Sequence, residues 1–422
     1  MILPTNGKIV VIDDNPEEGL ALVKALSRNN ISVKYFDGVS VDELPATPLK
    51  DVRIVFLDII LGVVASRKTQ VSKAVSVLKR ILDISRPVPY VLVAWTKDNK
   101  LIDPVIAKLK LNKPLIVVDL EKSECKNEDG TYDVDFIERK LNEKCGNFGS
   151  LTAFLLWENV VNNCAGEIFN DFTTFYPADK ENWDSNLKGV IHGLTEAFVG
   201  KDRMKDKAMT DKEKLRNAMF GINGVLIDSL ESAVQRNDLF EVGGINSINI
   251  ADKVKSKINT KMHLIESGEN NFPQTGNLYV LKKPSENVIN EIVTKNAVPE
   301  RKEDILASKP KLIELDITPR CDYAQSKRYA RLLTGIMLEG NIVGNKYFKK
   351  DIELSYRRCP VVTIDGKDCY LLFDYRFFKS LTTDELKARK DKSKYTIRHE
   401  LVVDIQASFS NHINRFGVTC IE

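Results

Sequence analysis

Three carboxylates, a hydroxyl and an ammonium group each follow an apolar stretch in the first third of the sequence. Asp13 and Asp14 follow "KIVVI", Asp58 follows "VRIVFL", Thr96 follows "YVLVAW" and Lys122 follows "PLIVVDLE". Clustered carboxylates repel one another unless a cation joins them. Oxygen ligands of this type suit Mg²⁺, which also takes up phosphate oxygens. If these segments share one edge of a sheet, they predict a site for Mg²⁺ and a phosphoryl group.

The elements around these residues alternate between strand and helix patterns. Continuous apolar runs predict strands, and apolar residues at three- and four-residue spacing predict helices. The strands are expected within residues 8–13, 31–38, 52–62, 89–99 and 114–124, and the helices within 17–30, 69–84, 102–112 and 134–145. This alternation predicts a five-stranded, parallel, doubly wound sheet. In such sheets the sites lie at the carboxyl ends of the strands, where the five residues stand.

Four motifs in this region carry a family resemblance. "VIDDN", "VFLDIILG", "AWT" and "DLEK" resemble the response-regulator receiver domain over about residues 7–145, which implies a flavodoxin-like fold. The resemblance implies that Asp58 accepts a phosphoryl group from a histidine kinase, and that Asp13 and Asp14 hold Mg²⁺ together with Asp58. It also implies that Thr96 and Lys122 contact the phosphoryl oxygens and relay the change.

The match to the receiver motifs has departures that leave alternatives open. Lys122 is followed by Ser123, whereas the family has a Lys-Pro pair, and the Lys113-Pro114 pair precedes the strand. We therefore expect Lys122 in the site, with Lys113 as the alternative. The Asp13-Asp14 pair could also act as a helix cap. Asp58 could belong to a pseudo-receiver that is never phosphorylated.

The remainder of the chain predicts two further domains. Helical patterns from 147 to 262 predict a helical bundle, and the polar segment 267–277 predicts a linker or long loop. Residues 263–422 predict an α+β domain, with a barrel-like arrangement as an option. Within it we expect a hairpin at Asp365-Gly366 and a helix ending at Gly417. The expected domains are therefore 1–146, 147–262 and 263–422, in a multidomain α/β protein.

The segment "TPRCDYAQ" places Cys321 and Asp322 directly after a strand pattern. It resembles the cysteine–aspartate motif of small barrel-like modules in bacterial defence and mobile-element proteins. Cys321 with His399 or His412 could form a nucleophile–base pair. Cys321, Cys359 and Cys369 could bind a metal, although their spacing is not typical of zinc ligands. A turn in which Asp322 bonds to the backbone is the structural alternative.

Composition restricts the class of protein. Hydrophobic residues make up 43% and charged residues 29% of the 422 residues, as in soluble globular proteins. The formal net charge of +3 gives no basic field for nucleic acid. The seven cysteines include no CxxC pair, which favours free thiols in a reducing compartment. We find no secretory signal or membrane-spanning stretch, so we expect a cytoplasmic protein without a membrane partner.

Two functions are therefore expected from the sequence. The first is a two-component regulator, not a classical enzyme, that passes the switch at Asp58 to its helical and α+β regions or to a protein partner. Its kinase would be a histidine kinase or kinase-like ATPase, in a bacterial stress or anti-phage system, and a homodimer is an option. The second is a pseudo-receiver docking module attached to a C-terminal effector enzyme, a hydrolase or nuclease.

Overall fold

The computed structural model divides into two compact units. It describes residues 6–62, 66–83, 88–96, 99–109, 112–146, 149–175, 181–205, 209–236, 249–270, 272–325, 328–340, 347–349 and 355–414. One unit comprises residues 1–183 with 222–246, and the other comprises 184–221 with 247–422. The division passes through the helical region expected at 147–262, and the three-domain arrangement stays a prediction.

The first unit is built on a five-stranded sheet in the order β2-β1-β3-β4-β5. Its strands are β1 Asn6–Ile12, β2 Ser32–Phe36, β3 Ile54–Leu57, β4 Val91–Ala94 and β5 Ile116–Asp119. All four strand pairs are parallel, so the predicted parallel sheet is confirmed. The strand order reverses between β1 and β3, and this switch point is where open α/β sheets place their ligands.

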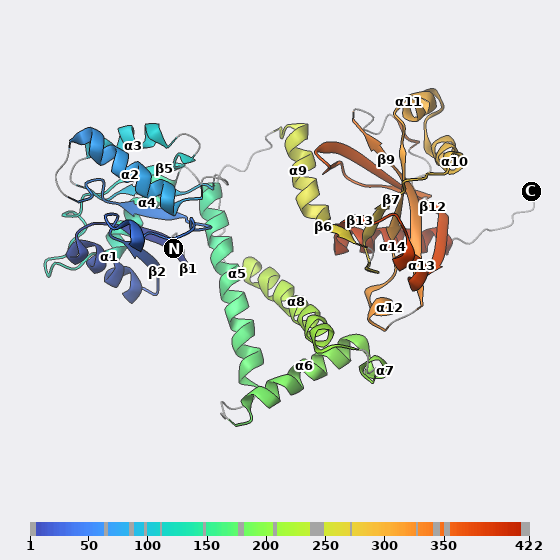
Figure 1. Ribbon diagram of the computed structural model, residues 1–422, viewed down its shortest axis with the longest axis horizontal. Coiled ribbons are helices and arrows are strands. Elements are labelled where there is room, and N and C mark those ends of the chain that lie inside the picture. Colours follow the sequence, from blue (N-terminus) through green and yellow to red (C-terminus); the bar gives the residue numbers. More distant parts are fainter. Residues whose placement is uncertain are drawn as a thin grey trace, which may run out of the picture. The chain divides into compact units, whose positions relative to one another are not determined.

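Helices cover both faces of this sheet (Figure 1). They are α1 Pro16–Arg28, α2 Arg67–Ile81, α3 Ile102–Lys108 and α4 Val134–Cys145, with short 3₁₀ turns η1 Val41–Glu43 and η2 Asn99–Leu101. Alternate residues of each strand point to opposite faces. Ile9 and Val11 pack in the core that includes α1 and α4, whereas Val10 and Ile12 pack in the core that includes α2 and α3. The sheet is therefore doubly wound.

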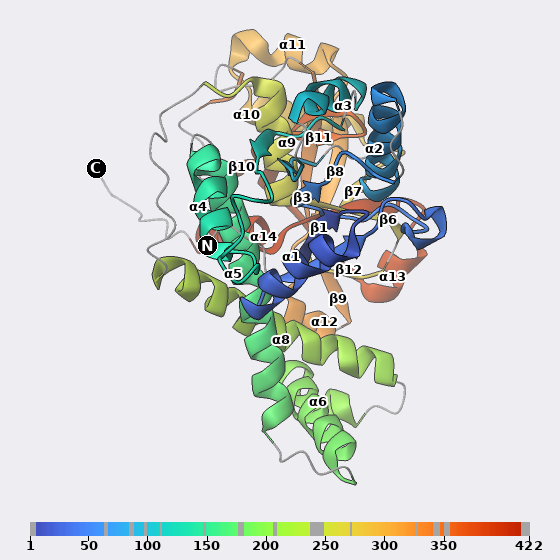
Figure 2. The same ribbon diagram turned by 90° about the vertical axis from the view of Figure 1, so that its left-hand side faces the viewer.

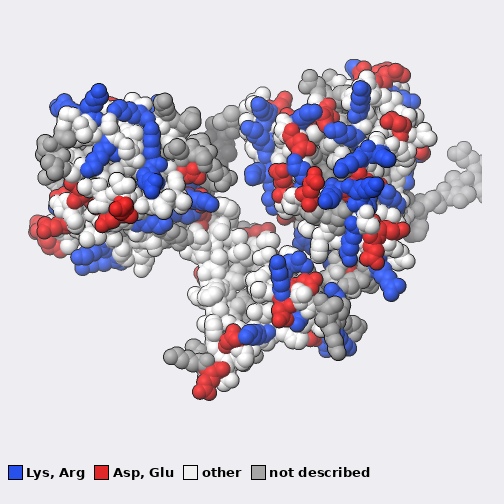
Figure 3. Space-filling view, in the orientation of Figure 1, with Lys and Arg blue, Asp and Glu red and all other residues white. Residues whose placement is uncertain are grey.

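Five helices follow the N-terminal sheet: α5 Gly149–Thr174, α6 Trp183–Val199, α7 Lys201–Met204, α8 Asp211–Arg236 and α9 Asp252–His263. Helix α5 starts beside α4 and runs away from the sheet in both ribbon views (Figure 2). Its Leu155 joins the core of the sheet, and its Glu158 pairs with Lys8 and with Arg53, whose Nη2 lies 3.1 Å from Glu158 Oε1. The helix has three acidic residues and no basic one, and the face seen in Figure 3 carries few charges. Through its ion pairs with Lys8 and Arg53, Glu158 acts as an anchor that fixes α5 to the sheet.

The second unit contains an eight-stranded sheet in the order β10-β12-β9-β8-β7-β13-β6, with β11 paired to β12. The strands are β6 Leu264–Asn270, β7 Asn277–Val280, β8 Lys311–Asp316, β9 Tyr329–Glu339, β10 Tyr356–Arg358, β11 Val362–Ile364, β12 Lys367–Thr382 and β13 Ser393–Ile397. The described path runs from β10 at one edge to β6 at the other, and the barrel-like arrangement stays a prediction. The linker expected at 267–277 is wrong in its first part, because β6 extends to Asn270 and pairs with β13.

Helices lie on both faces of the second sheet. They are α10 Glu286–Asn296, α11 Lys302–Ala307, α12 Arg320–Ala324, α13 Thr383–Ala388 and α14 His399–Ile413, with a 3₁₀ turn η5 Pro299–Arg301. Helix α14 joins one core through Leu401 and Ile405, and helices α10 and α11 join another. The β11–β12 turn has positive φ at Asp365 (49°) and Gly366 (77°), as a type I′ turn requires. Helix α14 ends at Ile413, and Gly417 lies outside the described residues.

Candidate functional site

Asp13, Asp14 and Asp58 meet at the carboxyl ends of β1 and β3. One oxygen of each carboxylate lies within 4.8 Å of the others. Asp13 has no exposed surface, and Asp14 and Asp58 are half-buried. Among the residues that the structure describes, this is the group of His, Cys, Asp and Glu side chains found close enough to share a metal ion. The sequence expectation that these three residues lie together agrees with this geometry.

Backbone amides hold one oxygen of each carboxylate. Asp13 Oδ1 accepts from the Asn15 N–H and Asp58 Oδ1 from the Ile60 N–H, both at 3.0 Å. Asp14 Oδ2 accepts from the Gly62 N–H at 2.7 Å. The first two bonds close the same two-residue turn after neighbouring strands. They leave Asp13 Oδ2 and Asp58 Oδ2 for a cation.

The cap of helix α1 is a separate feature. The side chain of Asn15 accepts from the Glu17 N–H, and Pro16 occupies the first turn. The alternative in which the Asp13-Asp14 pair caps the helix is therefore wrong.

Lys122 is the cation in contact with these oxygens. Its Nζ lies 2.8 Å from Asp13 Oδ2, 2.7 Å from Asp58 Oδ2 and 2.8 Å from Glu18 Oε2, and its side chain is 4% exposed. Burial by itself lowers the pKa of this ammonium group, but the contacts with the Asp13, Asp58 and Glu18 carboxylates outweigh it and raise the pKa. Lys122 therefore stays charged. The alternative, Lys113, is exposed and precedes β5.

Asp13 Oδ2 is a buried oxygen with an incomplete set of partners. Lys122 lies at ion-pair distance, yet this oxygen accepts no aligned hydrogen bond from the described residues. Burial raises the pKa of Asp13, while the contact with Lys122 lowers it. A buried acceptor left without aligned donors is costly. Together with the all-oxygen donor set, this shows that the cluster could bind a small divalent cation.

Two residues fix the end of β1 against helix α1. The Tyr35 hydroxyl donates to the Asp13 carbonyl oxygen at 2.7 Å. A Cβ at Gly19 would lie 2.5 Å from Tyr35 Cε2 and 3.0 Å from Asp13 Cβ. Glycine at position 19 therefore lets α1 pass close to Asp13, which brings Glu18 within reach of Lys122.

Thr96 lies at the end of β4, the neighbour of β3, and is 1% exposed. The preceding Trp95 is fully buried and packs edge-on against Phe56, with ring centroids 5.6 Å apart. Trp95 also donates its backbone N–H to the Leu57 carbonyl oxygen at 2.9 Å, one residue before Asp58. The tryptophan thus belongs to the core that supports the site, and the role of Thr96 toward a phosphoryl group stays a prediction.

Sequence reasoning missed Glu18. The signal was present in the printed sequence, because Glu18 falls in the first turn of the helix that follows Asp13 and Asp14. Its importance depends on how α1 is rotated over the end of β1, which no local pattern specifies.

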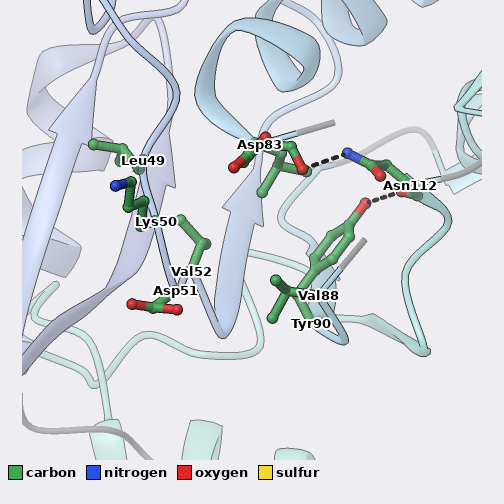
Figure 4. Close-up of a pocket in the computed structure, with 9 residues that line it drawn as sticks. Leu49, Lys50, Asp51, Val52, Asp83, Val88, Tyr90 and Asn112 are labelled. Atoms are coloured by element: carbon green, nitrogen blue, oxygen red, sulfur yellow. Dashed lines mark hydrogen bonds between the residues drawn. The ribbon is translucent and has the colours of Figure 1, made fainter. Parts of the chain in front are cut away.

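A cavity of about 360 Å³ lies at the opposite edge of the same sheet, before β3, β4 and β5 (Figure 4). Tyr90 donates its hydroxyl to the Asn112 carbonyl oxygen at 2.9 Å, and Asn112 Nδ2 donates to the Asp83 carbonyl oxygen at 3.3 Å. These hydrogen bonds join the loops that line the cavity. The cavity lies away from the carboxylates of the candidate site.

Comparison with known proteins does not place the chain in a family, so a functional assignment depends on the residues of the site. No family model matches the chain, and the search of curated proteins found no match. Within the described residues, every helix is too short or too polar to cross a bilayer. The resemblance to receiver domains accordingly rests on the motifs, and the strand order agrees with a flavodoxin-like fold.

In the second unit, Cys321 and His399 line the same cavity. Both side chains line an open cavity of about 450 Å³ together with Arg320, Thr275 and Gln406. His412 instead packs on the ring of Tyr375, with centroids 5.7 Å apart. Burial and Arg320 lower the pKa of His399. The nucleophile–base pair of Cys321 with His399 stays a prediction.

The structure also bears on the two other expectations for the segment "TPRCDYAQ", a metal site and a turn at Asp322. Cys359 and Cys369 are buried in the apolar core with no grouped ligand set among the described residues, which speaks against a metal site with exposed Cys321. Asp322 lies 3.3 Å from the Arg331 guanidinium. Its backbone N–H also donates to the Pro319 carbonyl oxygen at 3.0 Å, so the expectation of a turn in which Asp322 bonds to the backbone agrees with the structure.

Asp316, at the end of β8, is a buried carboxyl group. Its Oδ1 accepts from the Thr318 N–H at 3.0 Å and its Oδ2 accepts from the Tyr323 hydroxyl. Burial raises the pKa of Asp316 to about 6, against an ordinary 3.8. The folded protein therefore holds a proton on Asp316 at a pH where the unfolded chain has lost it.

We expect this group to make the second unit less stable as the pH rises. The contribution is fully present below pH 4 and is lost as the pH passes through about 6. Roughly 3 kcal/mol is at stake for a shift of this size. Hydrogen exchange of β8 and β9 peptides between pH 4 and 7.5, corrected for intrinsic exchange, measures the effect. Asp316→Asn should flatten the profile and the Asp322→Asn control should not; an unflattened Asp316→Asn profile would contradict the assignment.

Proposed function

We propose that the chain is a phosphorylation-controlled regulator whose N-terminal unit acts as a receiver domain. The observation that supports it most is the position of Asp58, which lies in a cluster with Asp13 and Asp14 and whose Oδ2 contacts Lys122. A nucleophilic carboxylate, a cation site and a fixed ammonium group are the components that phosphoryl transfer to an aspartate needs.

In the proposed reaction, a carboxylate oxygen of Asp58 attacks the phosphorus atom of a donor. A new O–P bond forms, the bond between phosphorus and the donor's leaving atom breaks, and the leaving group departs with its electron pair and takes a proton from solvent. Asp13, Asp14 and Asp58 would hold Mg²⁺, which when bound neutralises negative charge on the phosphoryl oxygens. Lys122 would pair with one phosphoryl oxygen, and the Thr96 hydroxyl would donate to another.

The acyl phosphate would change the charge at one edge of the sheet. A phosphorylated side chain carries about −1.5 to −2 charges near neutral pH. The phosphodonor would be a histidine kinase or kinase-like ATPase, and the output a contact with a protein partner. A net charge of +3 does not favour DNA as the target. The setting we infer is a bacterial two-component pathway serving stress or anti-phage defence.

A specific observation favours a second candidate. Lys122 already neutralises Asp13 and Asp58, while Cys321 and His399 share a cavity in the other unit. In this candidate the N-terminal unit is a docking module that is never phosphorylated, and the second unit is an effector hydrolase or nuclease.

The experiment incubates the purified chain with acetyl phosphate and either Mg²⁺ or EDTA, followed by intact mass measurement. We expect a single added phosphate in the presence of Mg²⁺ and almost none with EDTA, because the carboxylate cluster repels an anionic donor without a divalent cation. A folded sample that takes up no phosphate with Mg²⁺ would contradict the proposal and favour the docking module.

A further inference from the structure

Glu18 contributes a fourth carboxylate to the site. It lies in the first turn of α1, and its Oε2 accepts a hydrogen bond from Lys122 Nζ at 2.8 Å. Its other oxygen lies 3.7 Å from Lys126 Nζ. Glu18 is outside the group of three carboxylates that could share a metal ion. Glu18 therefore contacts Lys122 directly but is not one of the proposed metal ligands.

Lys122 and a divalent cation compete for the same oxygens. Asp13 and Asp58 each use Oδ1 for a backbone amide and present Oδ2 to Lys122. A metal bound by these carboxylates needs the oxygens that the ammonium group now contacts. Two cations on the same oxygens repel each other. Lys122 must therefore yield at least one carboxylate when a metal binds.

Glu18 offers the displaced lysine a partner. A buried ammonium group that loses its counter-ions is strongly destabilised, and Lys122 is 4% exposed. The contact with Glu18 is already formed at full hydrogen-bond distance, so no new contact has to be made. The lysine can release Asp13 or Asp58 while it stays paired and charged.

We propose that Glu18 is a positioning residue that retains Lys122 when a divalent cation occupies Asp13, Asp14 and Asp58. This inference rests on the metal binding included in the proposed function. Glu18 thereby lowers the cost of exchanging the internal cation for the metal, and it keeps the ammonium group beside Asp58. Binding of the metal and departure of Lys122 from Asp13 and Asp58 are one coupled event.

The test measures Mg²⁺ affinity by calorimetry, with no phosphodonor present. Glu18→Gln should weaken Mg²⁺ binding about tenfold, the lower end of the range for residues that position metal ligands. Glu17→Gln removes the same charge from an exposed neighbour in the same turn, and should change the affinity by less than about twofold, as surface substitutions usually do. Equal affinities for wild type and Glu18→Gln would overturn the inference.

A double variant separates positioning from the general field of a carboxylate. Lys122→Gln should bind Mg²⁺ more tightly than wild type, and adding Glu18→Gln to it should have little further effect. The same weakening by Glu18→Gln with and without Lys122 would mean that Glu18 acts through space, and the inference would be wrong. Wild type that binds no Mg²⁺ while Lys122→Gln binds it would also overturn it.

A structure of the wild-type chain with Mn²⁺ gives a readout that needs no substitution at Lys122. We expect Lys122 to keep Glu18 and to have left Asp13, Asp58 or both. A lysine that abandons Glu18 would overturn the inference. Failure of the proposed function is distinguishable, because Mg²⁺ binding with the Glu18 effect can be present in a chain that takes up no phosphate.

Discussion

Asp58→Asn is expected to lose phosphate uptake from acetyl phosphate by at least about a hundredfold, since the attacking carboxylate oxygen is replaced by an amide nitrogen. The substitution keeps the shape of the side chain. The amide oxygen can still accept the Ile60 N–H that Asp58 Oδ1 accepts at 3.0 Å. Lys122 would retain Asp13 and Glu18 as partners. The loss would therefore report chemistry and not unfolding.

Asp119→Asn is the matched control for Asp58→Asn. Asp119 ends β5 at the same edge of the sheet, but it is exposed and lies outside the carboxylate cluster. Its replacement should leave phosphate uptake within about twofold, as surface substitutions away from a site usually do. Intact mass gives the amount, and peptide mapping after hydroxylamine cleavage gives the position. Phosphate found on Asp13 or Asp14, or full uptake by Asp58→Asn, would contradict the role of Asp58.

Lys122→Met should lower the free energy of unfolding of the first unit by about 3–5 kcal/mol without metal, the usual cost of breaking a buried ion pair from one side. The variant leaves Asp13, which has no exposed surface, close to Asp58 without its counter-ion. Lys126→Met is the control, because Lys126 is 36% exposed and lies 3.7 Å from Glu18. It should cost less than about 1 kcal/mol, as exposed pairs do.

The effect of Lys122→Met should grow with pH and shrink with Mg²⁺. The pKa of Asp13 is already raised by burial, and losing Lys122 removes a contact that lowers it. Protonated Asp13 contributes its full stabilisation of the folded state below the ordinary pKa of 3.8. This contribution is lost as the pH rises through the raised pKa that Asp13 has in the folded state. Added Mg²⁺ binds the folded state and should restore part of the loss.

Tryptophan fluorescence during urea unfolding suits this measurement. Trp95, Trp157 and Trp183 are the three tryptophans of the chain, and all lie in the first unit. The signal therefore follows the unit that contains Lys122. A Lys122→Met transition that coincides with that of Lys126→Met would show that Lys122 does not neutralise the cluster.

The sequence contains enough information for the N-terminal sheet and for the three aspartates. Apolar runs such as "KIVVI" and "VRIVFL" have no alternation, which is typical of strands buried on both faces, and each is followed by acids. Helix α4 was expected at 134–145 and spans Val134–Cys145. These features depend on short stretches of chain, which is why local patterns predict them.

The parts that sequence reasoning missed depend on contacts between distant segments. Glu18 meets Lys122 because Gly19 lets α1 approach Tyr35 and Asp13. Strand β6 pairs with β13, more than a hundred residues further along the chain, so a polar segment that predicted a linker became a strand. The burial of Asp316 likewise arises from the assembled second unit, and its neighbours in sequence do not indicate it.

The ion pairs of Glu158 connect α5 to the two strands that carry Asp13 and Asp58. Lys8 and Arg53, which Glu158 binds, stand at the start of β1 and just before β3. Asp13 and Asp58 stand at the far ends of the same two strands. The five steps from Lys8 to Asp13 span roughly 17 Å at about 3.3 Å per residue. An ion pair lies near each end of both strands, with Glu158 at one end and with Lys122 at the other. A displacement of Asp13 or Asp58 along these strands would therefore be passed through Glu158 to α5, the helix that leads into the rest of the chain.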